Sequence, residues 1–159
     1  MKLTVKDYEF FQEQIMCLLE MPEIKQLDEY IQHGKITCLE HSISVAFSSF
    51  CMCKQLNMKV DYKSMIRGAM LHDYFLYDWH VKDESHRLHG FYHPFTAYHN
   101  AKKLFHLNAI EADIILKHMW PLTFLHIPRY KESVMVNIAD KLCSLMETIH
   151  LPVFRPDFI

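Results

Sequence analysis

Apolar residues recur at helical spacing along most of the chain, and this periodicity limits the fold more than any other feature. Near the start, for example, Tyr8, Phe11 and Ile15 fall on one face of a helix. The 159 residues include only three glycines, too few for the many tight turns of a β-sandwich or β-barrel. Half of the residues are hydrophobic, which is enough for a proper core. The sequence therefore predicts an all-α, single-domain helical bundle.

Capping residues, glycines and prolines divide the chain into segments of expected helix. Pro22 suits the first turn of the second segment, and Gly34 suits a left-handed residue just after its end. Residues 75–91 have no clear period, and an ordered loop of this length is often functional. We expect about six to eight helices. The segments lie near residues 4–20, 22–32, 38–57, 61–73, 93–105, 108–118 and 131–149.

Composition argues against several classes of function. The formal net charge of −2 gives no reason to expect a nucleic-acid partner, and no glycine-rich phosphate-binding motif occurs. Residues 1–9 carry charges where a signal peptide needs its apolar run, and no stretch approaches about 18 apolar residues. We therefore expect no targeting segment and no membrane partner. The five cysteines form no CxxC pair, which favours reduced thiols and a cytoplasmic location.

An ordered series of histidines and aspartates carries the candidate chemistry. Its members are scattered along the chain, yet each lies in or at the end of an expected helix. Helices of a bundle can project such side chains inward and so build a metal site in the core. The series consists of His41, His72, Asp73, His93, His118 and Asp140.

Asp140 is the member that most needs an explanation. It lies midway along the last segment, whose apolar pattern we expect to face the core. That pattern consists of Val134, Ile138, Leu142 and Leu145. Burying a carboxylate is very costly unless it is paired or coordinates a cation. A core lysine or arginine partner is the alternative to a metal ion.

The complete series resembles the HD superfamily of metal-dependent phosphohydrolases, which has an all-helical fold. The run Gly68-Ala-Met-Leu-His-Asp73 is similar to the small and apolar residues that precede the family's His-Asp doublet. The segments at His93-Pro94, His118 and Asp140 resemble the later motifs, including those of the HD-GYP branch. This chain lacks Gly-Tyr-Pro after His118, which argues against hydrolysis of a cyclic dinucleotide.

The resemblance also suggests how the chain is organised. Residues 71–80 and 118–122 look like a subgroup of small bacterial HD proteins of undefined substrate. The HD domain is expected over residues 36–150. Residues 1–35 would form a helical preface packed on it, and residues 151–159 a C-terminal tail.

The resemblance further implies a set of metal ligands. One ion would be held by His41, His72, Asp73 and Asp140. His93 and His118 match positions that hold a second ion in two-metal members, with Asp73 bridging the two. Imidazoles and carboxylates suit divalent iron, manganese, nickel or zinc, so we expect one or two such ions. Two ions about 4 Å apart can activate water for attack on a phosphate.

Roles in catalysis follow for a few further residues. We expect Asp73 to act as the bridging catalytic carboxylate, Lys117 to grip the phosphate and His89 to act as general acid. Lys141 is a further candidate cation for the phosphate, but it follows Asp140 directly, so we expect it to point about 100° away around the helix. Further candidate cations are Arg129 and Lys131, and further candidate acids are Asp78, His80 and His86.

The remaining aromatic residues and histidines have simpler interpretations. The aromatic residues after the doublet can stack a nucleobase, but packing of a lid onto the core is the favoured interpretation. They are Tyr74, Phe75, Tyr77 and Trp79. We expect structural or surface roles for the histidines outside the series, namely His33, His99, His106, His126 and His150.

Three functions remain open at this point. The first is a hydrolase whose metal-activated water cleaves a phosphate ester of a nucleotide or related small metabolite. The second is an HD-fold di-iron oxygenase, because the same six side chains can hold two irons that activate dioxygen. The third, which the intact ligand set disfavours, is a non-catalytic binding or sensory module. The substrate, the metal and the oligomeric state are not predicted.

Overall fold

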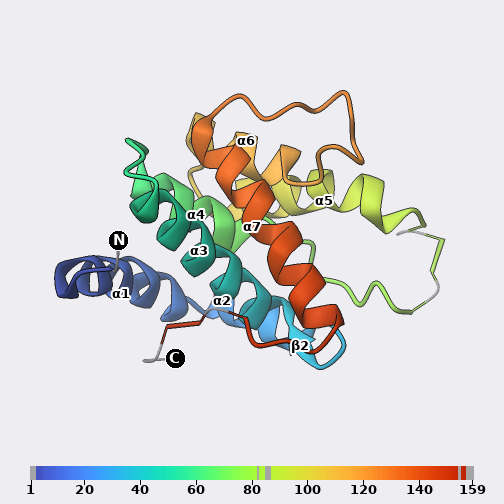
Figure 1. The fold of residues 1–159 in the computed structure, drawn as a ribbon. Helices are drawn as coiled ribbons and strands as arrows, with labels where there is room; N and C mark the ends of the chain where they lie inside the picture. Colours follow the sequence, from blue (N-terminus) through green and yellow to red (C-terminus); the bar gives the residue numbers. More distant parts are fainter. Residues whose placement is uncertain (1–2, 82, 85–86, 154, 157–159) are drawn as a thin grey trace.

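The structure, a computed structural model, describes residues 3–81, 83–84, 87–153 and 155–156 and is mostly helical, as predicted (Figure 1). Its α-helices are α1 (Val5–Leu19), α2 (Pro22–Lys25), α3 (Cys38–Gln55), α4 (Tyr62–Leu71), α5 (His89–Leu104), α6 (Ala109–Lys117) and α7 (Lys131–Thr148). The other elements are a 3-10 helix, η1 (Gln26–Glu29), and a hairpin of β1 (Ile31–His33) and β2 (Ile36–Thr37).

Reciprocal caps explain where three of the helices begin. Thr4, Thr37 and Asn108 each accept a hydrogen bond from the backbone three residues later, and an acidic side chain at that position bonds back to the cap. Asp61 caps α4 through the backbone of Ser64. These caps satisfy backbone N–H groups that have no partner within the helix. They confirm the predicted starts.

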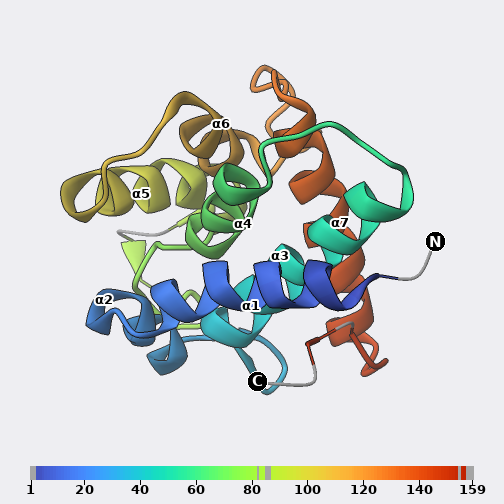
Figure 2. The ribbon, with the colours of Figure 1, turned by 90° about the vertical axis from the view of Figure 1, so that its left-hand side faces the viewer.

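Helices α3 and α4 form the centre of the bundle. α3 packs against α4 and α7, α4 packs against α6, and α5 packs against α6. α1 lies on the side of the bundle away from α5 and α6 (Figures 1 and 2). Its Phe11 and Ile15 are fully buried in the same core as Phe50 of α3 and Ile66 of α4. One core therefore holds all the helices together.

The predicted second helix, residues 22–32, is helical only as far as Glu29, and its second half is a 3-10 helix. α2 ends at Lys25, and after η1 the chain forms the β1–β2 hairpin. Gly34 has φ +60°, as a left-handed residue should, but it lies in the turn of this hairpin rather than after a helix. β-Branched residues such as Ile31 and Ile36 favour strands. The hairpin directs Gln32 into the interior, where its side chain is buried.

The predicted start of the fifth long segment, at His93, also needs correction. α5 begins one turn earlier, at His89, so the predicted loop is shorter and Pro94 lies inside the helix. Proline has no N–H to donate, and it is tolerated best near a helix start. The extra turn places His89 one turn before His93, on the same face of α5.

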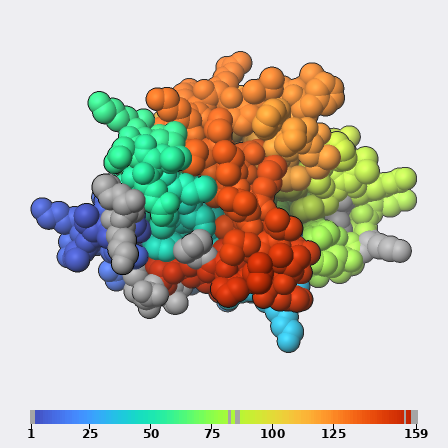
Figure 3. Space-filling model, in the orientation of Figure 1, coloured from blue at the N-terminus to red at the C-terminus, as the bar shows by residue number. Residues whose placement is uncertain are grey.

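The predicted core face of α7 is wrong, although Asp140 is buried. The expected apolar face is the exposed one: Val134, Ile138, Leu142 and Leu145 are 42–58% exposed. Figure 3 shows α7 crossing this side of the molecule uncovered. The buried face instead combines apolar and polar residues, namely Glu132, Ser133, Met135, Val136, Asn137, Ala139, Asp140, Cys143 and Glu147.

Within the described residues, every helix is too short or too polar to cross a lipid bilayer.

Gly68→Ala tests the close approach of α4 to α6. A Cβ added at Gly68 would lie 2.6 Å from Cδ1 and 3.2 Å from Cβ of Ile114. Overpacking of this kind costs about 1–3 kcal/mol, which outweighs the gain of about 1 kcal/mol from replacing a helical glycine. We expect a lower free energy of unfolding in urea. Adding Ile114→Val, which removes Cδ1, should recover part of the loss. A Gly68→Ala protein as stable as wild type would contradict the prediction.

Candidate metal centre

All six residues of the predicted series come together in the structure. They project from α3, from α5, from α7 and from the residues that directly follow α4 and α6. Each is at most 6% exposed, so the cluster lies in the interior. The members are His41, His72, Asp73, His93, His118 and Asp140.

Three of the imidazoles are oriented by a backbone carbonyl. Nδ1 of His72 donates to the carbonyl of Ala69 at 2.6 Å. In the same way, Nδ1 of His93 donates to the carbonyl of His89 at 2.9 Å, and Nδ1 of His118 to that of Ile115 at 2.9 Å. A carbonyl oxygen only accepts, so Nδ1 carries the proton in each ring. In the neutral tautomer, Nε2 therefore presents a lone pair. The three lone pairs are directed into the cluster.

His41 is oriented by a carboxylate instead. Its Nδ1 donates to Oε2 of Glu147 at 2.8 Å, and its Nε2 lies 3.2 Å from Oδ1 of Asp140. A carboxylate behind a histidine fixes the ring and makes its other nitrogen a better ligand. Glu147 follows Asp140 by two helical turns, so α7 provides both groups from one face.

The two oxygens of Asp73 face different histidines. Oδ1 lies 3.2 Å from Nε2 of His93 and 3.5 Å from Nε2 of His118. Oδ2 lies 3.2 Å from Nε2 of His72 and 3.8 Å from Nε2 of His41. Asp73 therefore divides the cluster into two sets of donor atoms. Asp140 belongs to the set with His41 and His72.

Two ring nitrogens face each other with too few protons between them. Nε2 of His93 and Nε2 of His118 are 2.7 Å apart. With the Nδ1 protons already engaged, both nitrogens are acceptors when the rings are neutral. Nε2 of His72 and Oδ1 of Asp73 are also buried without a hydrogen-bond partner among the described residues. A cation fits this arrangement, because it satisfies several converging lone pairs at once.

The charged groups of the cluster shift one another's pKa values strongly. Burial raises the pKa of Asp73, but His72 and the other rings lower it more, so the pKa lies well below its usual value. Burial lowers the pKa of His41, but Asp140 and Glu147 raise it to about 9. Burial lowers the pKa of His118 to about 4, and the neighbouring rings contribute. The carboxylates thus favour the protonated, positively charged form of His41, while burial keeps His118 neutral.

The described residues therefore contain buried groups that can hold a metal ion. The donor atoms of each group lie within 4.8 Å of one another. One group consists of His41, His72 and Asp73. Another consists of Asp73, His93 and His118. Imidazole nitrogens and carboxylate oxygens are ligands for divalent transition metals. The helical fold and this cluster are compatible with an HD-like protein.

Gln32 supports the cluster and was not predicted from the sequence. Its Nε2 donates to Oδ2 of Asp73 at 2.6 Å, and its Oε1 accepts from Sγ of Cys38 at 3.4 Å. The bond holds the Asp73 carboxylate in one orientation. No local signal marks Gln32, because its partner is 41 residues away. Glu147 had a signal, since it lies two turns from Asp140.

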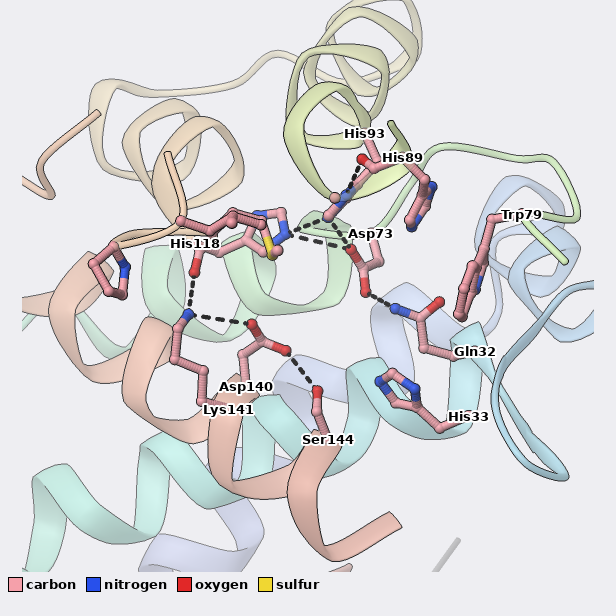
Figure 4. Close-up of a pocket in the computed structure, with 14 residues that line it drawn as sticks. Gln32, His33, Asp73, Trp79, His89, His93, His118, Asp140, Lys141 and Ser144 are labelled. Carbon is pink, nitrogen blue, oxygen red and sulfur yellow. Dashed lines mark hydrogen bonds and ion pairs between the residues drawn. The ribbon is translucent and has the colours of Figure 1, made fainter. Parts of the chain in front are cut away.

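A pocket of about 730 Å³ opens onto the cluster (Figure 4). It exposes Asp73, Asp140, His93 and His118 on one side. The other residues that line it are Gln32, His33, Trp79, His89, Gly90, Met119, Pro121, Leu122, Lys141 and Ser144. His33, which we expected to be structural or on the surface, therefore lies at the site, with its ring 5.4 Å from that of His41.

The two lysines near the ligands differ from the expectation. Lys117, predicted to grip the phosphate, forms an ion pair with Asp113 and is not among the residues that line the pocket. Lys141, expected to point away from Asp140, reaches into the pocket. Its Nζ donates to the carbonyl of His118 at 2.7 Å and lies 3.9 Å from Oδ2 of Asp140. A long side chain can bend back, so the 100° step between neighbours does not fix where its charge lies.

His89 lines the pocket, as its predicted role requires. Its ring stacks on that of His93 at 4.4 Å and on that of Trp79 at 5.2 Å, and Tyr77 contacts its Nδ1 at 2.8 Å. The ring of Trp79 also packs against that of His80, with the centroids 4.0 Å apart. The aromatic residues after the doublet therefore pack on one another and on the core. This agrees with the favoured interpretation of a packed lid.

The remaining candidates lie away from the pocket. Lys131 is exposed at the start of α7, and Arg129 donates its backbone N–H to Asp113. Asp78 and His80 form an exposed pair at 3.0 Å. His86 lies outside the described residues. His99, His106 and His150 are exposed, as expected, and His126 contacts the ring of Phe95.

No protein-family model matches the chain, and no curated protein and no solved structure matches it.

Glu147→Gln tests the support of His41. The amide keeps the shape of the side chain but loses the charge that strengthens the ring as a ligand. We expect the affinity for Zn²⁺ or Mn²⁺ to fall by about 10–100-fold, measured by competition with a chromogenic chelator. Glu13→Gln, on the exposed side of α1, is the matched control and should leave the affinity unchanged. Equal affinities in both variants would show that Glu147 does not support the ligand.

The stabilisation by metal should grow as the pH rises. The ion pairs of protonated His41 with Asp140 and Glu147 stabilise the metal-free protein, and this stabilisation is fully present below about pH 6.5. It is lost as the pH rises through about 9, the raised pKa of His41. A metal ion must displace the same proton, so its binding is favoured at higher pH. We expect the increase in Tm on adding Mn²⁺ to be larger at pH 8.5 than at pH 6. An increase that is equal at both values would contradict the competition.

Proposed function

We propose that the chain is an HD-type metal-dependent phosphohydrolase acting on a phosphate ester of a nucleotide or related small metabolite. The observation that carries this proposal is the convergence of four oriented imidazoles and two carboxylates beside a pocket large enough for a small metabolite. The resemblance to the HD superfamily supports the choice of phosphate esters. The alternative of a di-iron oxygenase uses the same ligands, and the experiment below separates the two.

The residues divide naturally between two ions. His41, His72, Asp140 and Oδ2 of Asp73 would hold one. His93, His118 and Oδ1 of Asp73 would hold the other. The chemistry that such ions supply when bound is activation of water at neutral pH and neutralisation of phosphoryl oxygens.

The chain's own residues would orient the reactants and move protons. Gln32 holds Asp73 so that its two oxygens stay directed to the two sets of histidines. His89 lines the pocket beside His93 and is held by the hydroxyl of Tyr77. We assign to His89 the delivery of a proton to the leaving oxygen, which a histidine can do near neutral pH. The stacked rings of Trp79 and His89 line this side of the pocket, where they would limit the access of water.

Metal analysis and an anaerobic phosphatase screen test the proposal. Purified protein supplied with manganese, nickel or iron(II) should release phosphate from one or more mono- or dinucleotides. Asp73→Ala should lose both metal and activity, because it removes a ligand from each set. His118→Ala should reduce the metal content from two ions to one.

Two outcomes would contradict the proposal. Full metal occupancy in Asp73→Ala would show that the cluster is not the metal site. Oxygen consumption with an organic substrate, together with no phosphate release from any ester, would favour the oxygenase.

A further inference from the structure

We infer that Lys141 binds the phosphoryl group of the substrate, and that the pocket prefers esters with a single phosphate to diphosphates and triphosphates. The inference rests on the proposed function for the reaction. The contact itself can be tested by binding alone.

The position of Lys141 places a positive charge at the edge of the ligand cluster. Its side chain enters the pocket beside Asp140 and His118 (Figure 4). An ammonium group has three N–H donors. Among the described residues, only the carbonyl of His118 accepts one of them within hydrogen-bond distance. The ammonium therefore has donors left for a ligand, and its side chain is 41% exposed.

A purely structural role explains this position poorly. The carbonyl of His118 already accepts from Nδ2 of Asn137 at 2.5 Å, so it does not require Lys141. Oδ1 of Asp140 contacts His41 at 3.2 Å and Ser144 at 3.3 Å, while Oδ2 faces Lys141. The distance of 3.9 Å from Lys141 to Oδ2 of Asp140 is too long for a hydrogen bond. The ammonium thus makes one hydrogen bond and one long ion pair at the cluster, and these contacts leave donors for a ligand.

The number of cations limits the charge that the pocket can bind. Lys141 is the one lysine or arginine among the described residues that line it. Three cations that do not line the pocket have acidic partners: Lys117 with Asp113, Arg67 with Glu111 and Arg155 with Glu40. A triphosphate needs several donors along its length, which proteins usually provide with cations and a glycine-rich loop. One ammonium beside the ligand cluster suits one phosphate.

The rest of the pocket suits an organic group. Met119, Pro121 and Leu122 form an apolar part of its lining. The Trp79 ring already packs against the rings of His80 and His89. The organic group of the ester is therefore expected to pack on the aliphatic side chains rather than to stack on the tryptophan.

Binding of inorganic phosphate to the metal-loaded protein tests the contact without any reaction. Calorimetry should show that Lys141→Met weakens phosphate binding by about 10–100-fold, the value of a lost charged hydrogen bond. Lys141→Arg should restore most of the affinity. Lys103→Met, on the exposed side of α5, is the matched control and should bind as wild type does. Equal affinity in Lys141→Met and wild type would overturn the inference.

Kinetics with AMP, ADP and ATP test the preference for one phosphate. We expect the highest kcat/KM with AMP, and Lys141→Met should raise the KM for AMP more than it lowers kcat. Faster cleavage of ATP than of AMP would overturn the preference. If the wild type binds phosphate through Lys141 but hydrolyses no ester, the proposed function fails and the binding site stands. If esters are hydrolysed equally by Lys141→Met, the inference fails and the proposed function stands.

Discussion

The structure depends on a group of buried acceptor atoms that meet with too few protons between them. Three imidazoles have committed their Nδ1 protons to backbone carbonyls, and the fourth has committed its own to Glu147. What remains in the centre is a set of lone pairs and two carboxylates. Without a cation or additional protons, this arrangement would cost far more than a small domain gains on folding.

The helices reinforce this demand for positive charge. His72 and His118 are the residues that end α4 and α6, so the C-termini of both helices point at the cluster. The C-terminal end of a helix carries partial negative charge and favours a nearby cation. Gly68 allows α4 and α6 to approach closely enough for their ends to meet. The same close approach therefore packs the core and assembles the site.

Features set by local interactions were predictable from the sequence. The caps at Thr4, Thr37 and Asn108 bond within three residues, so their patterns are visible in a short window. The six candidate ligands were found because their order resembles a family pattern. The hairpin at Gln32 was missed because the interaction that explains it, with Asp73, joins residues far apart in the chain. The placement of Lys141 was missed for a similar reason, since its acceptor lies on another helix.

The wrong face predicted for α7 shows how a functional site can override hydrophobic periodicity. Periodicity assigns the apolar side of a helix to the core because burial of apolar area usually dominates. In α7 the inward side also carries polar groups with partners on other elements. They are Asn137, Asp140 and Glu147, and the side chain of Lys141 bends back to join them. Because these groups must face the cluster, the apolar residues one step around the helix are turned outward. The docking of α7 therefore combines hydrogen bonds and ion pairs of the site with apolar contacts of Met135, Val136, Ala139 and Cys143, so that the same helix face packs the core and builds the site.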